Sequence, residues 1–179
     1  YDILLKKLIL LEKVYPQYSS QDSPTQRVGA IPLKNFETIK HSIPMLSLAN
    51  AMNEEEIINF DRQVSKNLGT KNTIEYIAEP KLDGLAVELV YHAGKFAYGS
   101  TRGDGVYGEN ITENLKTIKG IPLSITGQKI PELLEIRGEV FINHNDFKNL
   151  NKTQLKNNLE PFANARNCAA GSLRQLNSQ

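Results

Sequence analysis

The spacing of the apolar residues changes near Gly69, and this change decides which fold class the chain can adopt. Before it, apolar side chains recur every three or four residues over 57–68, in a helix that Asn53 caps, with Glu56 as its return partner, and that Gly69 ends. Beyond it the period changes to two: alternation predicts a strand at 74–78, a β-rich run predicts one at 85–91, and a turn at 92–95 joins the latter as a hairpin to a strand at 96–101. Together these patterns predict an α+β chain with mainly antiparallel strands.

Further elements are predicted on both sides of this central part. A leucine-bearing helix opens at Asp2 and stops before Pro16. The polar, proline-bearing stretch 17–44 predicts a linker and a domain boundary. A short helix near 111–118, a strand at 133–142, a helical tail from Asn143 and a last helix at 169–176 capped by Asn167 complete the prediction.

Composition narrows the classes of protein that remain. The 179 residues are 40% hydrophobic, enough for a core in one domain or in one domain and part of a second. Because 21 Lys+Arg stand against 20 Asp+Glu, the net charge is +1, and binding to nucleic acid requires a local patch. No apolar run reaches the ~18 residues of a membrane span. The single Cys168 excludes an internal disulfide and a multi-cysteine zinc site and favours a reducing compartment. From the opening Tyr1 we expect a chain cut from a longer one.

The segment Glu79-Pro80-Lys81-Leu82-Asp83-Gly84 concentrates charge between two predicted strands. In extended geometry Glu79, Lys81 and Asp83 project to one side, while Gly84 lets the backbone turn or approach a ligand. One interpretation is a surface ion-pair ladder, and the other makes Lys81 a nucleophile. Because two carboxylates favour the charged amine, a nucleophilic Lys81 needs desolvation, a bound divalent metal or another cation close by, for which Arg102 is a candidate.

Two further charged segments are open to a structural and a functional interpretation. Thr101-Arg102-Gly103-Asp104-Gly105 either brings backbone N–H groups to a phosphate or forms a plain turn. In the predicted strand 133–142, Glu135, Arg137 and Glu139 share one face, as is normal for a half-exposed strand.

The tail from Asn143 is locally basic, with five Lys and Arg residues against two acidic ones. Near 166–174 a helix start can meet a phosphate, although a solvated helix face explains the same pattern. The three histidines, His41, His92 and His144, have no spacing that indicates a metal pair.

Taken in order, six segments resemble successive signatures of the bacterial NAD-dependent DNA ligases. They cover nearly the whole chain: Asp22-Ser23-Pro24-Thr25-Gln26-Arg27-Val28-Gly29, Pro44-Met45-Leu46-Ser47-Leu48, Glu79-Pro80-Lys81-Leu82-Asp83-Gly84, Thr101-Arg102-Gly103-Asp104-Gly105, Glu135-Ile136-Arg137-Gly138-Glu139-Val140-Phe141 and Ala169-Ala170-Gly171-Ser172-Leu173-Arg174-Gln175-Leu176.

The resemblance implies a reaction and a nucleophile. Lys81 is expected to attack the adenylyl phosphorus of NAD, release nicotinamide mononucleotide and carry AMP, with Asp83 beside it as the second catalytic residue. The AMP then passes to the 5′-phosphate of a nick, and the 3′-hydroxyl displaces it to seal the strand in DNA replication and repair. A divalent ion, Mg²⁺ or Mn²⁺, would neutralise the phosphate charge that repels the nucleophile.

The resemblance also implies binding residues. Glu79 and Arg102 would hold the adenosine part of NAD, and Glu139 would accept from a ribose hydroxyl. Ser47 and Leu48 would line the nucleotide pocket. The remaining expected contacts are Tyr1 and Asp2 for nicotinamide mononucleotide, and Arg166 and Arg174 for the DNA backbone.

The family further implies how the chain is organised. Residues 1–30 would be the last helix and linker of the N-terminal nicotinamide-recognition domain, and 31–179 the first part of an adenylation, or nucleotidyltransferase, domain. Zinc would belong only to a C-terminal part that follows. We expect a bacterial cytoplasmic enzyme that acts as a monomer on nicked double-stranded DNA. Two alternatives stay open: an ATP- or GTP-dependent nucleotidyltransferase of the RNA-ligase or capping type, and an inactive fragment that binds nucleotide or DNA.

Overall fold

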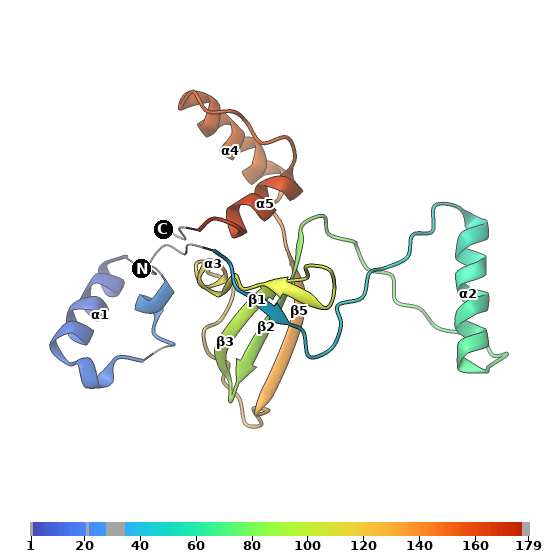
Figure 1. The fold of residues 1–179 in the computed structure, drawn as a ribbon, viewed down its shortest axis with the longest axis horizontal. Helices are drawn as coiled ribbons and strands as arrows, with labels where there is room; N and C mark the ends of the chain where they lie inside the picture. Colours follow the sequence, from blue (N-terminus) through green and yellow to red (C-terminus); the bar gives the residue numbers. More distant parts are fainter. Residues whose placement is uncertain (1, 21, 28–34, 177–179) are drawn as a thin grey trace. The chain divides into compact units, whose positions relative to one another are not determined.

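A computed structural model describes residues 2–20, 22–27 and 35–176, and they form helices beside two antiparallel sheets (Figure 1). The α+β class predicted from the spacing pattern is therefore confirmed. The elements in chain order are α1 Asp2–Val14, the 3₁₀ turns Pro16–Tyr18 and Pro24–Arg27, β1 Thr38–Lys40, α2 Glu54–Leu68, β2 Leu85–His92, β3 Lys95–Thr101, β4 Tyr107–Glu109, α3 Thr112–Lys116, β5 Leu133–Val140, α4 His144–Lys156 and α5 Ala165–Leu173.

The chain divides into two compact units. One comprises residues 1–45 together with 82–179, and the other is Leu46–Lys81. The boundary predicted between residues 30 and 31 lies outside the described residues and stays a prediction.

The larger unit is built on a three-stranded antiparallel sheet in the order β3-β2-β5. The predicted hairpin is confirmed, with β2 paired to β3 and the turn between them made by Ala93 and Gly94, both at positive φ. On its other side β2 pairs with β5 from Leu85↔Val140 to His92↔Leu133. Because β2 is paired on both sides, it is held in place by both neighbouring strands, and its first residues come directly after Asp83 and Gly84.

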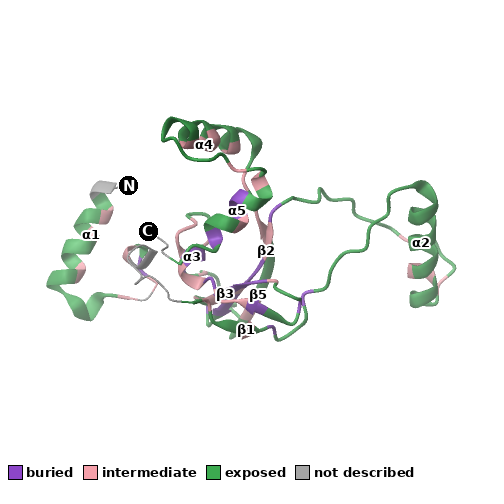
Figure 2. Cartoon of the chain, turned by 45° about the horizontal axis from the view of Figure 1, so that its top comes forward, coloured by how far each residue is buried: buried purple, intermediate pink, exposed green. Residues whose placement is uncertain are grey.

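The core of this unit lies on one face of the sheet. Because side chains alternate along a strand, the odd-numbered residues Leu85, Val87 and Leu89 share that face. Val87 packs with Ile111 and with Leu115 of α3 and Leu173 of α5. Buried residues accordingly gather in the sheet, α3 and α5, whereas α4 is largely exposed (Figure 2).

A second, two-stranded sheet pairs β1 with β4 and was not predicted. Both strands have three residues, and one lies within the stretch predicted as a linker, the other within the glycine-bearing loop. Gly108 is at the centre of the pairing, where a Cβ would meet the Thr101 carbonyl oxygen at 1.8 Å. Only a residue without a side chain fits there.

The smaller unit contains α2 and confirms its predicted ends. The Asn53 side chain accepts from the Glu56 backbone N–H, and Gly69 ends the helix at φ 63°. The strand predicted at 74–78 is wrong, since these residues have no regular secondary structure. A strand needs a hydrogen-bonded neighbour, and no described strand pairs with this segment. It is instead tied to α2 by a hydrogen bond from the Tyr76 hydroxyl to Asp61, 2.8 Å long.

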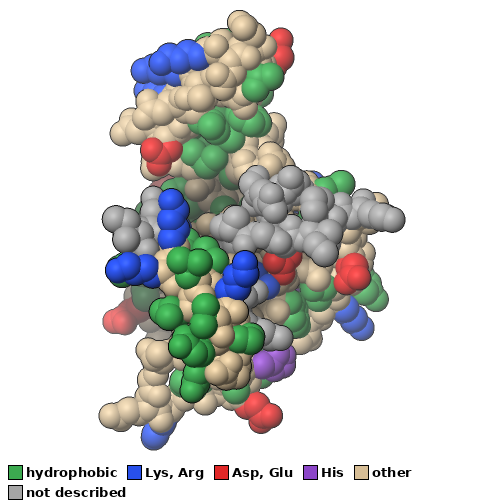
Figure 3. Space-filling view, turned by 90° about the vertical axis from the view of Figure 1, so that its left-hand side faces the viewer, with side chains coloured by type: hydrophobic (Ala, Val, Ile, Leu, Met, Phe, Trp, Pro, Cys, Tyr) green, Lys and Arg blue, Asp and Glu red, His purple; other side chains and the backbone are tan. Residues whose placement is uncertain are grey.

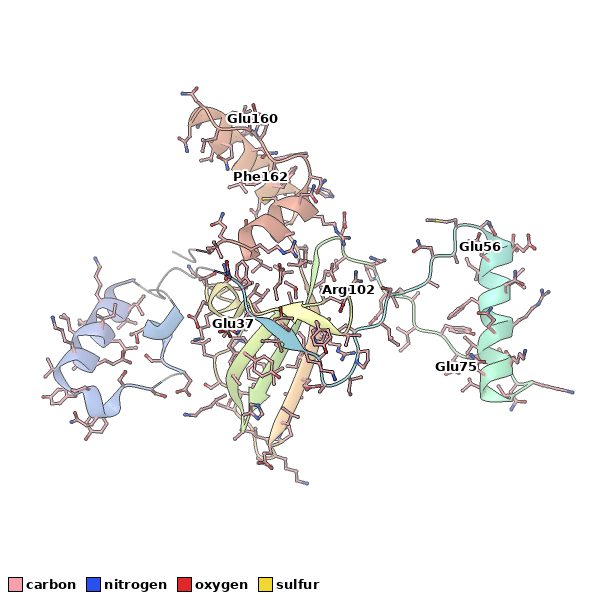
Figure 4. All side chains as sticks on the ribbon, viewed as in Figure 1. Glu37, Glu56, Glu75, Arg102, Glu160 and Phe162 are labelled. Carbon is pink, nitrogen blue, oxygen red and sulfur yellow. The ribbon has the colours of Figure 1, made fainter. Side chains whose placement is uncertain are left out.

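The C-terminal helices follow the sequence prediction with one correction. The helix α4 begins after Asn143, whose side chain accepts from the Asp146 backbone N–H. The last helix starts four residues earlier than predicted, because Asn164, not Asn167, is its cap and accepts from the Asn167 backbone N–H at 2.7 Å. Asn151 of α4 holds the loop before α5 by two hydrogen bonds to the backbone of Phe162, which Figure 4 labels.

The surface of α1 is partly apolar. Hydrophobic side chains gather on its exposed side, beside Lys side chains (Figure 3). The helix α4 also carries three Lys residues. Among the helices described, none has the length and apolar character needed to cross a bilayer.

Candidate nucleotide and DNA site

The predicted nucleophile lies at the end of the smaller unit. Glu79 and Lys81 are exposed, in a segment without regular secondary structure, and so are Ser47 and Leu48 at the other end of this unit. Asp83, two residues after Lys81, already belongs to the larger unit. The predicted constellation therefore divides between the two units, with these four residues in the smaller unit and the others in the larger one.

Asp83 has a partner that the sequence analysis did not predict. The Arg166 Nη1 atom lies 3.1 Å from Asp83 Oδ1, in an ion pair whose side chains are 50% and 76% exposed. The helix α5 supplies Arg166 near its first turn, and Asp83 immediately precedes the sheet. The pair thus joins the predicted catalytic carboxylate to a predicted DNA-binding arginine.

Glu139 lies next to the same point of the chain. Its Oε1 atom accepts from the Gly84 backbone N–H at 3.2 Å, across the pairing of β2 with β5. Gly84 is required here, because a Cβ would lie 2.1 Å from the Val140 carbonyl oxygen. The structure therefore brings Asp83, Glu139 and Arg166 to the start of β2.

Arg102 follows β3 and opens a tight loop (Figure 4). Its backbone N–H donates to the Ala86 carbonyl at 3.0 Å, and its own carbonyl accepts from the Gly105 N–H at 3.0 Å. Gly103 has φ 56°, and a Cβ there would lie 1.8 Å from the Tyr107 carbonyl oxygen. The backbone of the loop is thus tightly constrained, while the half-buried Arg102 guanidinium has no hydrogen bond or ion pair with a described residue.

Asp104 closes this loop. Its carboxylate accepts from the backbone N–H groups of Val106 and Tyr107, at 2.8 and 2.7 Å. These two hydrogen bonds, with that from Tyr107 the larger cause, lower the pKa of Asp104 below its ordinary value. The carboxylate therefore stays ionised and holds the turn.

Arg174, the second predicted DNA contact, is also paired. Its Nε atom lies 2.6 Å from Glu109 Oε2, with the two side chains 51% and 37% exposed. Glu109 ends β4, so the pair joins the residue after α5 to the two-stranded sheet. Arg166 and Arg174 are both held by carboxylates and both remain half exposed.

A buried charged group lies on the other face of the sheet. His41 Nδ1 is 2.7 Å from Glu88 Oε2, and the two side chains are 0% and 1% exposed. Arg137, opposite Glu88 in the strand register, approaches the second carboxylate oxygen at 3.4 Å. From the sequence, Arg137 was predicted only as a strand residue and His41 only as lacking a metal partner. The signal available was Glu88 itself, a charge within the apolar run 85–91.

The remaining predicted residues are placed as follows. Asp2 is the first residue of α1, and Tyr1 lies outside the described residues. Within the described part of the chain, no three His, Cys, Asp or Glu side chains are grouped so that they could hold a metal ion. Mg²⁺ thus has no assigned ligands here.

Comparison with known proteins agrees with this architecture. Residues 33–179 match the NAD-dependent DNA ligase adenylation domain, and residues 1–29 match the DNA ligase-like, N-terminal NAD⁺-binding domain. DNA ligases of Geotalea uraniireducens and Geobacter sulfurreducens are 54% and 53% identical over all of this chain and 27% of their own length. That of Thermotoga neapolitana is 51% identical over 99% of this chain and 25% of its length.

The chain has an α+β fold with antiparallel sheets, and its Lys-x-Asp-Gly segment leads into the central strand. Both features are typical of a nucleotidyltransferase-type domain. The chain belongs to the NAD-dependent DNA ligase adenylation domain family. It spans about a quarter of the length of the curated relatives it matches.

Proposed function

We propose that this chain is the adenylating part of an NAD-dependent DNA ligase, with Lys81 as the residue that takes AMP from NAD. The observation that carries the proposal is the family match over 33–179, which includes Lys81 in its Lys-x-Asp-Gly segment. Residues 1–30 would belong to the nicotinamide-recognition domain and 31–179 to the adenylation domain.

The proposed chemistry is a group transfer in three steps. The neutral Lys81 Nζ attacks the adenylyl phosphorus of NAD, an N–P bond forms, and the P–O bond to nicotinamide mononucleotide breaks. The AMP then moves to the 5′-phosphate of a nick, which frees the lysine. Attack by the neighbouring 3′-hydroxyl on that phosphate releases AMP and closes the phosphodiester.

We propose that Glu79 and Arg102 hold the adenosine part, that Glu139 accepts from a ribose hydroxyl, and that Ser47 and Leu48 line the pocket. Support for Arg102 comes from its guanidinium, which lies on a constrained loop and has no hydrogen bond or ion pair with a described residue. Support for Glu139 comes from its carboxylate, since the bond from Gly84 uses Oε1 and leaves Oε2 available. Tyr1 and Asp2 would contact the nicotinamide mononucleotide part.

Asp83 would act beside Lys81, from the position in which Arg166 now holds it. A divalent cation, Mg²⁺ or Mn²⁺, would supply neutralisation of the phosphate charge. No described cluster of carboxylates or histidines fits it, so no residue is assigned to the ion and no step depends on one.

The proposed partner is nicked duplex DNA, contacted by Arg166 and Arg174. Both arginines are half exposed, and each lies on or directly after α5, so one face of this helix would meet the phosphates. We further propose a monomer in the bacterial cytoplasm, where a buried, unpaired Cys168 stays reduced. Zinc would be bound only by a C-terminal part beyond the family match.

The proposal is tested by the intact mass of the purified chain before and after incubation with NAD and Mg²⁺, with ATP in a parallel sample. We expect a gain of one adenylate from NAD alone. A gain from ATP instead would support the nucleotidyltransferases of the RNA-ligase or capping type and contradict the proposal.

A further inference from the structure

A charge in the middle of the sheet is the feature that the proposed function does not use. The strand β2 is the central one, and all residues over 85–91 except Glu88 are apolar. Glu88 is nevertheless only 1% exposed. Burying an ion pair is often no more stabilising than burying apolar residues of the same volume. The position of Glu88 therefore calls for a role other than stability.

The hydrogen bonds of His41 define what this carboxylate does. His41 Nε2 lies 3.1 Å from the Arg102 carbonyl oxygen, and Nδ1 lies 2.7 Å from Glu88 Oε2. A carbonyl oxygen only accepts, so His41 donates to it from Nε2, while Nδ1 faces the Glu88 carboxylate. Glu88 thus fixes the orientation of the ring that holds the Arg102 carbonyl.

Arg137 extends the same group to the neighbouring backbone. Its guanidinium approaches Glu88 Oε1 at 3.4 Å, donates to the Pro44 carbonyl at 3.1 Å and donates to the Ile43 carbonyl. The Met45 N–H in turn donates to the Gly105 carbonyl at 2.8 Å. Arg137 thus joins Glu88 to the backbone of residues 43 and 44, and the Met45 bond joins the next residue to the loop that Arg102 opens.

We propose that His41 and Glu88 are positioning residues for lysine adenylation, holding the Arg102 carbonyl so that the Arg102 guanidinium is presented to the nucleotide. This inference rests on the proposed function, because it takes Arg102 as a nucleotide contact. The target of His41 is a backbone carbonyl and not the guanidinium, so the side chain stays available for a ligand.

Two substitutions at position 41 separate the two bonds of the imidazole. His41→Asn places an amide near the Nδ1 position, which keeps a donor for Glu88 and loses the bond to Arg102. His41→Gln reaches the Nε2 position, which keeps the bond to Arg102 and loses the partner of Glu88. Glu135→Gln is the matched control, since Glu135 lies on β5 and accepts a hydrogen bond from Ser42, next to His41, on an exposed site.

The first readout is amide hydrogen exchange over 103–107, which requires no activity. We expect about tenfold faster exchange in His41→Asn, the factor for one hydrogen bond of ordinary net strength, and a nearly unchanged rate in His41→Gln and Glu135→Gln. His41→Gln should instead lower the melting temperature, because the buried Glu88 carboxyl loses its hydrogen-bonded partner at Nδ1. Equal exchange in the two position-41 variants would overturn the proposal.

The second readout is the NAD concentration that gives half-maximal attachment of AMP. It should rise by about tenfold in His41→Asn relative to His41→Gln, the change for one lost positioning bond. If this NAD concentration instead rises most in the variant with the lowest melting temperature, His41 has a structural role only and the proposal is overturned. If the unmodified chain takes no AMP, the proposed function fails, while the exchange rates still decide whether His41 holds the loop.

Discussion

Asp83 and Arg166 form an ion pair, with 3.1 Å between Oδ1 and Nη1, although 83 positions separate them in the chain. The pair places a residue proposed for DNA binding against a residue proposed for catalysis. Because both side chains are largely exposed, solvent screens their attraction, and the pair adds little to stability. Its contribution is to hold Arg166 of α5 against Asp83, directly before the start of β2.

Arg166→Ala should separate binding from stability. We expect a change of at most about 0.5 kcal/mol in the free energy of unfolding, as for other exposed ion pairs. Affinity for nicked duplex should fall, and the slope of log affinity against log salt should decrease by about 1, the effect of one lost phosphate contact. Fluorescence anisotropy of a labelled duplex over a salt series measures both.

Arg62→Ala is the control for this substitution. Arg62 lies on α2 and its only described hydrogen bond goes to Asn59 one turn away. It should leave the affinity and the salt slope unchanged. An unaltered salt slope in Arg166→Ala would show that Arg166 does not contact phosphate.

Gly84→Ala should disrupt the start of the central strand. The added Cβ would lie 2.1 Å from the Val140 carbonyl oxygen, so the β2–β5 pairing must open and the bond from Gly84 to Glu139 is strained. We expect a loss of about 2 kcal/mol or more in urea unfolding, as for other overpacked sites. Gly138→Ala, in the same sheet and with nothing within 4 Å of its Cβ, should cost far less. Similar losses for both variants would contradict this account of Gly84.

Acidification should loosen the Arg102 loop through Asp104. Backbone N–H groups of Tyr107 and Val106 lower the pKa of this carboxyl from its ordinary 3.8, so the ionised form is favoured in the folded state. Its stabilisation is therefore present above the ordinary value and is lost as the pH falls through the lowered one. The protection factors of the residue 106 and 107 amides, in which the intrinsic pH dependence of exchange is divided out, should therefore fall at acid pH in the wild type.

Asp104→Asn tests the sign of this effect. The amide oxygen still accepts a hydrogen bond but carries no charge, so the difference in unfolding midpoint between wild type and variant should shrink as the pH falls from 7 to 3. A difference that grows toward acid pH would contradict the prediction. The matched comparison is Asp146→Asn at the start of α4, far from this loop.

Local sequence signals predicted the elements that depend on nearby residues. The cap at Asn53 and the end at Gly69 set the bounds of α2, and the β-rich run at 85–91 with the turn after it set the hairpin. The segment 74–78 does alternate, but a strand forms only where a neighbour supplies hydrogen bonds, which the spacing of one segment cannot reveal.

Long-range relationships escaped prediction for a related reason. Strands β1 and β4 have three residues each and pair across about 70 positions, too short for any periodicity to appear. The partners Asp83 and Arg166, and His41 and Glu88, meet only because the sheet and α5 bring them together. The motif at Lys81 could be recognised in the sequence because its residues are consecutive. The network around Glu88 left only one sign in the sequence, a single charge within the apolar run 85–91.

The most direct test of the central claim is to incubate the wild type and Lys81→Arg with NAD labelled in its adenylate, and to map the label by peptide mass spectrometry. Arginine keeps the charge of lysine but is not an amine nucleophile, so the fold should persist with the same melting temperature. We expect the adenylate on Lys81 in the wild type and no label in the variant. A variant that takes up adenylate at the rate of the wild type would contradict the account.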